Sequence, residues 1–467
     1  MAVFGVIVST RGFFPGWLAE EARERIFSKL EAMGHEYVAV NRDEMPYGAV
    51  ETYEQALACA ERFKKNRDRI DGLLVILPNF GSEIGVATAI HEADLDVPVL
   101  VQACDDKMDL LDVAHRRDAF CGKLSVCNNL RQQGIAYSLT GLHTCDIDSA
   151  EFTEDLRRFE KLCGVVNGLR KARILAVGTR PQPFRTVRFS EKLLQKYGVT
   201  VFVEDMGNII AQARELESGD EIEKRVADIR SYAFTAPDTP AEKLERLARF
   251  SLSLEKAVDK CGASAGAVQC WDVLQGQFGC AACLAMSMLG EKGIPQACEM
   301  DVTGALTMYA LSLAAGTPAG YLDWNNNFGD DRDMCINFHC SNYPASFIGK
   351  KPELGVLDIL GTQLGRDHCY GACTAQVEPG PMTFCKITTD DVNGRIRAYV
   401  GEGEFGGADV RSFGGPAVCK VSGLQKLMHM LCEEGFEHHV SMVRGHVADI
   451  VEEALSKYMG WDVIRHC

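Results

Sequence analysis

The sequence predicts an α/β protein: two Rossmann-like or flavodoxin-like domains, each built on a parallel sheet, followed by a C-terminal β-rich, barrel-like domain. Two observations support this fold class. Through roughly the first 350 residues, short apolar strands alternate with amphipathic helices, as in parallel sheets that helices cover on both faces. Beyond that point, short strands alternate with Gly-rich turns, which is typical of an antiparallel barrel or sandwich. We expect domains at residues 1–168, 169–350 and 351–467.

The first expected domain opens with a strand at residues 3–9. Its helices are expected at 17–33, 53–65 and 84–93, and its further strands at 36–40, 73–77 and 98–102. After the first strand, Arg11-Gly-Phe-Phe-Pro-Gly stands where a dinucleotide-binding protein has G-x-G-x-x-G, and its Phe and Pro residues do not form a phosphate cradle. We therefore expect no nucleotide cofactor. The segment Pro78–Glu83 follows the third strand and either faces a ligand or forms a plain turn.

The second expected domain begins after a polar helical tract at residues 149–171. A strand at 173–178 leads into the loop 179–188, which contains Arg180, Arg185 and Arg188. Because prolines restrict its backbone, this loop is either an anion-binding fork of guanidinium groups or a solvent-facing loop. Residues 189–196 form a helix and 200–203 a strand, and 205–262 are helical. A strand at 267–271 then carries Gln269 near its end.

Two carboxylates and an imidazole mark the end of this domain. Residues 289–298 are expected to form a helix end, a turn and a short strand, and Glu299 directly follows this strand. An apolar helix is expected next, at 304–315, with Asp301 as its N-cap. A strand at 319–324 ends near Asp323, and His339 follows the apolar stretch 334–338. Side chains at the carboxyl ends of parallel strands converge, and this set suits Mn²⁺, Mg²⁺ or Zn²⁺. The competing interpretation is a helix cap and a core histidine.

Composition narrows the possible functions. A formal net charge of −16 argues against a nucleic-acid-binding surface and against attraction to anionic membranes. The first residues read as a strand, not a signal peptide, and no run of about 18 apolar residues suggests a membrane span. The 19 cysteines are expected to stay reduced in the cytoplasm, and the CxxC at Cys280–Cys283 to pack in a core.

In the C-terminal domain, strands are expected at residues 355–361, 384–387, 395–400, 417–421 and 461–465, and a helix at 446–458. The pair His438-His439 precedes the last helix. Adjacent side chains on a strand point to opposite faces, so at most one of these imidazoles easily ligates a given metal.

Several dispersed segments in the same order resemble the L-fucose isomerase and L-arabinose isomerase superfamily. Ala297-Cys-Glu-Met-Asp-Val-Thr-Gly-Ala-Leu-Thr-Met308 is similar to its metal-binding Glu segment, Tyr321-Leu-Asp-Trp324 to its Asp segment, and Phe338-His-Cys340 to a histidine segment. The tracts 117–130 and 178–194 are also family-like. The likeness runs over most of the chain.

This resemblance implies a metal-dependent aldose–ketose isomerase. Glu299, Asp323 and a C-terminal histidine would bind Mn²⁺, with Mg²⁺ or Co²⁺ as alternatives; alignment on Gly445-His446 makes the histidine His438, and His439 is the alternative. Gln269 would contact substrate, and His339 would be either a ligand, as in the arabinose branch, or a substrate contact. The metal would hold two oxygens of an open-chain sugar, while Glu299 and Asp323 move a proton between C1 and C2 through an enediol.

The resemblance also implies a homo-oligomer, a trimer or a hexamer, in which Arg11 and the loop 79–83 complete a neighbouring subunit's pocket. The substrate would be a neutral deoxyhexose or pentose, or an anionic sugar such as sulfoquinovose held by Arg180 and Arg185. A non-catalytic sugar-binding or regulatory protein of the same fold is the alternative. An NAD-linked oxidoreductase is disfavoured because the glycine fingerprint is missing.

Overall fold

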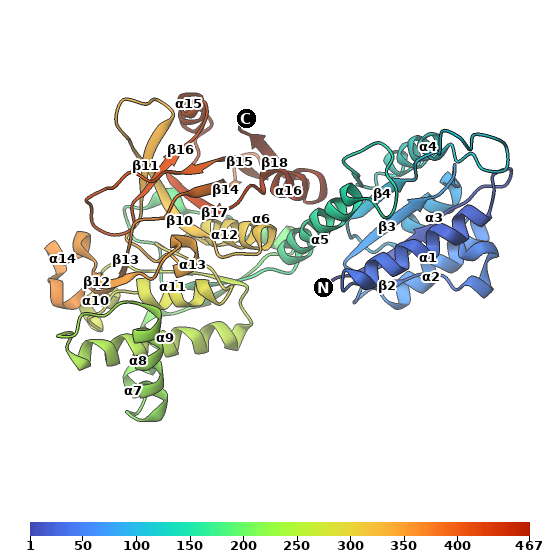
Figure 1. Cartoon of the computed structure of the whole chain (residues 1–467). Helices are drawn as coiled ribbons and strands as arrows, with labels where there is room; N and C mark the ends of the chain where they lie inside the picture. Colours follow the sequence, from blue (N-terminus) through green and yellow to red (C-terminus); the bar gives the residue numbers. More distant parts are fainter. The chain divides into compact units, whose positions relative to one another are not determined.

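The computed structural model describes residues 1–467 and divides into two compact units, Met1–Asn167 and Gly168–Cys467 (Figure 1). Two parallel sheets covered by helices and a C-terminal β-rich sheet confirm the predicted fold class. None of its helices combines the length and the apolar character needed to cross a lipid bilayer.

The first unit is a five-stranded parallel sheet in the order β2-β1-β3-β4-β5, the flavodoxin-like order, with helices on its faces. The fully buried strand β3 has the sequence GLLVIL, as expected of a strand that helices cover on both sides. Its strands are β1 (Val3–Val8), β2 (Glu36–Val38), β3 (Gly72–Leu77), β4 (Val99–Ala103) and β5 (Ser138–Leu139). Its helices are α1 (Trp17–Ala32), α2 (Tyr53–Lys65), α3 (Glu83–Ala93), α4 (Ala119–Gln132) and α5 (Ala150–Arg170), of which α5 ends just beyond the unit boundary.

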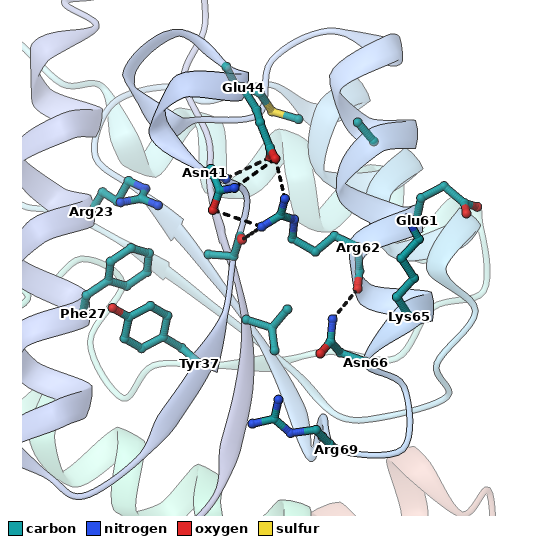
Figure 2. A pocket seen from close by; sticks show the side chains of 14 residues that line it. Arg23, Phe27, Tyr37, Asn41, Glu44, Glu61, Arg62, Lys65, Asn66 and Arg69 are labelled. Carbon is teal, nitrogen blue, oxygen red and sulfur yellow. Dashed lines mark hydrogen bonds and ion pairs between the residues drawn. The ribbon is translucent and has the colours of Figure 1, made fainter.

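A cavity of about 850 Å³ in the first unit lies among residues of α1, β2 and α2 (Figure 2). One of its basic side chains, Arg62, is already engaged: it donates to the carbonyl of Ala39 and to Asn41, and forms an ion pair with Glu44. None of the predicted site residues lines this cavity.

The second unit begins with a four-stranded parallel sheet in the order β7-β6-β8-β9. Its strands are β6 (Arg173–Val177), β7 (Thr200–Glu204), β8 (Ala265–Val268) and β9 (Gln296–Ala297). The helices of this part are α6 (Glu191–Lys196), α7 (Met206–Glu215), α8 (Asp220–Tyr232), α9 (Ala241–Cys261), α10 (Val273–Gln277), α11 (Cys283–Glu291) and α12 (Val302–Ala315). The cysteines of the CxxC are buried at the start of α11, which agrees with core packing.

The rest of the unit is a seven-stranded mixed sheet in the order β14-β17-β10-β11-β16-β15-β18. Because β14 also pairs with β15, six of these strands close into a barrel, and β18 adds to β15 in parallel. The strands are β10 (Gly320–Asn327), β11 (Met334–Phe338), β14 (Gly380–Asp390), β15 (Arg395–Phe405), β16 (Ala417–Lys420), β17 (His439–Arg444) and β18 (Asp462–Arg465).

Smaller elements surround the barrel. A two-stranded sheet pairs β12 (Glu353–Val356) with β13 (Tyr370–Thr374). The helices are α13 (Ala345–Ile348), α14 (Asp358–Leu364), α15 (Leu424–Glu434) and α16 (Ala448–Glu453), the last continued by a π-helical turn at Ala454–Tyr458. The prediction of a strand at residues 355–361 is therefore wrong in its second half, because residues 358–361 belong to helix α14.

Strand β10 corrects a second prediction. We expected residues 319–324 to continue the parallel sheet of Glu299, but β10 is a barrel strand, hydrogen-bonded antiparallel to β11 and β17. Helix α12, apolar on nearly all sides, packs against β8 and β9 of the parallel sheet and against β14 and β17 of the barrel. The Glu299 turn at its N-terminus therefore lies where the parallel sheet meets the barrel.

Candidate metal centre

Glu299 lies in a strained turn between β9 and α12. Glu299 and Met300 both have left-handed backbone conformations, with φ of 53° and 57°, which cost non-glycine residues on the order of 1–2 kcal/mol each. The amide of Met300 donates to the carbonyl of Val268 at the end of β8, which fixes the turn to the parallel sheet. Such strain is typical of functional sites, where surrounding structure holds a side chain in a required direction.

Three further side chains come from one end of the barrel. Asp323 on β10 is paired directly with His439, the first residue of β17, and on its other side with Phe338, the last residue of β11. His339 follows immediately. The antiparallel register therefore brings together residues that lie more than 100 positions apart in the sequence.

These side chains converge on Glu299. Its Oε2 atom lies 3.4 Å from Nε2 of His339 and 3.7 Å from Nε2 of His439, and the latter atom is 3.6 Å from Oδ1 of Asp323. Glu299, His339 and His439 are almost completely buried, whereas the Asp323 side chain is 25% exposed. This geometry leaves Asp323 on the open side of the cluster.

The converging oxygens have no hydrogen-bond donors. Oε2 of Glu299 and Oδ1 of Asp323 are both buried and accept no hydrogen bond. A buried carboxylate oxygen without a donor is unfavourable by several kcal/mol, roughly, unless a cation takes the donor's place. Nε2 of His439 is common to two groups of converging ligand atoms, one with Glu299 and His339 and the other with Asp323 and His438. These mixed carboxylate and imidazole sets suit a divalent first-row metal ion, so the residues present fit such an ion.

The adjacent histidine occupies a different environment. His438 precedes β17, its side chain is 45% exposed, and its Nε2 atom lies 4.0 Å from Oδ1 of Asp323. The two imidazoles nevertheless lie close together, with ring centres 4.4 Å apart and a nitrogen of each near Asp323, so they do not point to opposite faces as expected; His438 lies just before the strand and not on it. Of the two, only His439 approaches both Glu299 and Asp323.

The other oxygen of Glu299 is held by two donors that we did not predict. Oε1 accepts hydrogen bonds from the indole Nε1 of Trp271 at 2.8 Å and from the thiol of Cys270 at 3.5 Å. Burial opposes ionisation of Glu299, but the His339 imidazole and the hydrogen bond from Cys270 hold the pKa of its carboxyl below the ordinary value. The position of Trp271, two residues after the predicted Gln269, was the one sequence signal for this contact.

Behind His439 lies a buried polar group. Tyr321 donates to Oδ2 of Asp301 at 2.6 Å, and Nδ1 of His439 lies 2.5 Å from the Tyr321 oxygen and 3.1 Å from the same Asp301 oxygen. Lys386 of β14 forms a fully buried ion pair with Asp301. Burial would raise the pKa of Asp301, but Lys386 and His439 hold it well below its ordinary value, so the carboxylate is ionised. We predicted Asp301 only as the N-cap of α12; a lone lysine within the apolar stretch of β14 was the signal for its partner.

Gln269 lies next to this cluster, directly after β8. Its side-chain oxygen accepts a hydrogen bond from the amide of Thr179 at 2.9 Å, and the residue is 8% exposed. The Gln269 side chain therefore holds the start of the arginine loop, at Thr179, against the end of β8.

The loop 179–188 also lies beside this site, next to Trp271 and His439. Its Phe184 ring packs edge-on against Trp271 at 5.2 Å and lies 6.4 Å from the ring of His439. Arg180, Arg185 and Arg188 line a cavity of about 1040 Å³ together with Met300, the neighbour of Glu299. Arg180 and Arg188 donate only to backbone carbonyls, and none of the three forms an ion pair with a carboxylate of this chain.

Arg11 belongs to the first unit, at the carboxyl end of β1. It forms an ion pair with Glu83 and lies 4.4 Å from the centre of the Phe80 ring. Arg11 therefore contacts the 79–83 loop with which it was predicted to act. The expected role of both in a neighbouring subunit's pocket stays a prediction.

Comparison with known proteins identifies the family. The model of the fucose/sulfoquinovose isomerase N-terminal domain matches residues 5–170, and that of the L-fucose isomerase C-terminal domain matches residues 337–466. Together they cover well over half of the chain.

Curated relatives give the same result. The chain is 25% identical to a sulfoquinovose isomerase of Alkalicoccus urumqiensis over 313 residues, which span 66% of this chain and 68% of the relative. It is 23% identical to the sulfoquinovose isomerase of Priestia megaterium over 309 residues, 65% of this chain and 66% of the relative. A sulfoquinovose isomerase of Clostridium sp. is 29% identical over 187 residues, 39% of this chain and 40% of the relative. The chain therefore belongs to the fucose isomerase-related superfamily of sugar isomerases.

Proposed function

We propose that this protein is a metal-dependent aldose–ketose isomerase whose Mn²⁺ ion is held by Glu299, Asp323 and His439. The observation that carries the proposal is the convergence of two buried, donor-free carboxylate oxygens on one imidazole nitrogen. The geometry favours His439 over His438, our first expectation, because only His439 reaches both carboxylates. Mg²⁺ or Co²⁺ would fit the same donors.

When bound, the dication supplies Lewis-acid polarisation of the sugar carbonyl and offsets negative charge on two neighbouring sugar oxygens. The two carboxylates then differ in their freedom to move a proton. Oε1 of Glu299 already accepts hydrogen bonds from Trp271 and Cys270, which hold the carboxylate in place. Asp323 is partly exposed and is therefore the freer of the two to carry the proton between C1 and C2 through an enediol.

Phe184 and Trp271 cover the cluster with aromatic surface next to His439. Apolar cover of this kind excludes water, which strengthens the electrostatic interactions inside the site.

For the substrate we propose an open-chain sugar with an anionic tail, of the sulfoquinovose class that the relatives' names indicate. Three arginines without carboxylate partners line the cavity next to the Glu299 turn, and guanidinium groups hold sulfonate, phosphate and carboxylate by paired hydrogen bonds. A neutral deoxyhexose or pentose, which would leave these guanidinium groups unused, is the competing substrate class.

The test is isomerisation of a sugar panel by metal-stripped and Mn²⁺-loaded enzyme, with ketose formation followed by NMR. We expect turnover only with Mn²⁺, and preference for sulfoquinovose over L-fucose and D-arabinose. Arg185→Ala should raise KM for sulfoquinovose by about 10- to 100-fold, the loss of one charge-assisted contact, and leave KM for a neutral sugar unchanged. Metal-independent sugar binding without turnover would instead support a non-catalytic binding protein.

A matched pair of variants tests the metal ligand. His439→Ala should weaken Mn²⁺ binding, measured by electron paramagnetic resonance titration, by about 100-fold or more, while His438→Ala should change it little. The reverse result would restore His438 as the ligand, and equal binding by both variants and the wild type would refute the proposed centre.

A further inference from the structure

The two ring nitrogens of His439 face different groups, and this difference determines where its proton lies. Nε2 faces the carboxylate oxygens of Glu299 and Asp323 at 3.7 and 3.6 Å. Nδ1 faces the opposite way, toward the Tyr321 hydroxyl and Asp301. A neutral imidazole donates through one nitrogen and accepts through the other, so the groups around Nδ1 select the tautomer.

The hydrogen bonds around Asp301 can be assigned one by one. Oδ1 accepts from the amide of Gly304 at 2.7 Å and from the hydroxyl of Thr303 at 2.9 Å, which caps helix α12. Oδ2 accepts from Lys386, which can only donate, and from the hydroxyl of Tyr321. With four donors around its two oxygens, Asp301 acts as a hydrogen-bond acceptor only.

The single proton of the Tyr321 hydroxyl is therefore committed to Asp301. At Nδ1 of His439, the tyrosine oxygen can then only accept, and Asp301 can only accept. Nδ1 must carry the ring proton, and Nε2 is left with a bare lone pair directed at Glu299 and Asp323. This is the tautomer that a histidine needs in order to bind a metal through Nε2.

We infer that Asp301, supported by its contacts with Lys386 and Tyr321, is a positioning residue that holds His439 as its Nδ1–H tautomer and so presents Nε2 for metal binding. The inference rests on the proposed function. Lys386 acts through Asp301: as a buried cation it keeps the carboxylate in its acceptor-only form. A buried ion pair often contributes no net stability compared with well-packed apolar residues. Apolar residues in place of Asp301 and Lys386 could not, however, select the tautomer of His439.

Two substitutions separate this role from a structural one. In Asp301→Asn, the amide oxygen can still accept from Gly304 and Thr303, so the cap remains, but the other position becomes an NH₂ group that donates. The Tyr321 hydroxyl then accepts from it and donates to Nδ1, which places the ring proton on Nε2. In Tyr321→Phe, Asp301 still accepts from Nδ1 directly across 3.1 Å, so the tautomer is kept.

We therefore expect Asp301→Asn to weaken Mn²⁺ binding about 100-fold or more and Tyr321→Phe by less than about 10-fold, measured by electron paramagnetic resonance titration. Asp205→Asn is the matched control, because Asp205 also caps a helix, α7, by accepting from an amide of its first turn, and this variant should bind Mn²⁺ like the wild type. Wild-type affinity in Asp301→Asn, or equal losses in Asp301→Asn and Tyr321→Phe, would overturn the inference.

A second measurement does not depend on any Asp301 variant folding. Two-bond ¹H–¹⁵N correlation spectra of the metal-free wild type, with the His439 signals assigned by their loss in His439→Ala, report the tautomer directly. Nδ1–H supports the inference and Nε2–H overturns it. Because no metal is present in this measurement, failure of the proposed Mn²⁺ site would appear separately, as wild-type protein that does not bind Mn²⁺.

Discussion

At the scale of single residues, Gly178 shows how closely the backbone approaches the predicted substrate contact. Its φ is +80°, and a Cβ at this position would lie 2.8 Å from Cβ of Gln269 and closer still to its Oε1. Gly178→Ala should therefore displace Gln269 as well as strain the backbone. We expect it to lose at least about 1–2 kcal/mol of unfolding free energy and to raise KM about tenfold, the effect of losing one hydrogen bond.

Gly316→Ala is the control for backbone strain alone. Gly316 ends α12 with a φ of +75°, and nothing lies within 4 Å of a Cβ placed there. Chemical denaturation and steady-state kinetics of both variants check the prediction. An unchanged KM in Gly178→Ala would show that Gln269 does not need its present position.

At the scale of elements, Glu255 on α9 joins three helices of the second unit. It forms ion pairs with Arg225 on α8 and with Lys292 at the end of α11, and its side chain is 20% exposed. Burial opposes its ionisation, but Lys292 and Arg225 hold the pKa of Glu255 below its ordinary value of 4.5. The resulting stabilisation is fully present above pH 4.5 and is lost as the pH falls through the lowered pKa of the folded state.

Glu255→Gln should accordingly lower the unfolding free energy by about 1 kcal/mol near neutral pH, and the difference from the wild type should shrink below about pH 4.5. Urea unfolding at several pH values measures this difference. Glu221→Gln removes an ion pair with Lys256 in which both side chains are at least half exposed, so it should cost less than about 0.5 kcal/mol. A wild-type advantage that grows at acid pH would contradict the assigned sign.

At the scale of the whole molecule, all proposed metal ligands belong to the second unit, Gly168–Cys467. Metal binding to the folded state should therefore stabilise this unit alone, by about 2.7 kcal/mol when free Mn²⁺ is 100 times its dissociation constant. Three of the four tryptophans, Trp271, Trp324 and Trp461, report on the second unit, and only Trp17 on the first.

Thermal unfolding of Trp17→Phe, followed by tryptophan fluorescence in EDTA and in Mn²⁺, isolates the second unit. We expect its midpoint to rise with Mn²⁺, and to rise much less in the same background carrying His439→Ala. A thermal unfolding midpoint that does not change when Mn²⁺ is added would be inconsistent with a metal centre formed on folding.

Much of the fold followed from local patterns. The alternation of apolar strands and amphipathic helices predicted two parallel sheets because burial on both faces requires apolar runs such as Gly72–Leu77. The position of Glu299, between a short strand and a capped apolar helix, was likewise predicted, since caps and strand ends are local signals. The sheet to which Asp323 belongs was not, because a strand's own residues do not specify its hydrogen-bonding partners.

The chain's sequence by itself determined its fold class, its family and the small set of residues from which a metal site can be built. Only the tertiary structure distinguished the surroundings of His438 and His439, because neighbouring residues share the same local pattern, whereas the register of β17 against β10 pairs His439 with Asp323 and His438 stays 45% exposed. It also supplied the partners of the site: Trp271 and Cys270 at Glu299, and Asp301, Tyr321 and Lys386 behind His439. Such contacts join residues far apart in the chain, and packing creates them only when the parallel sheet and the barrel close around α12.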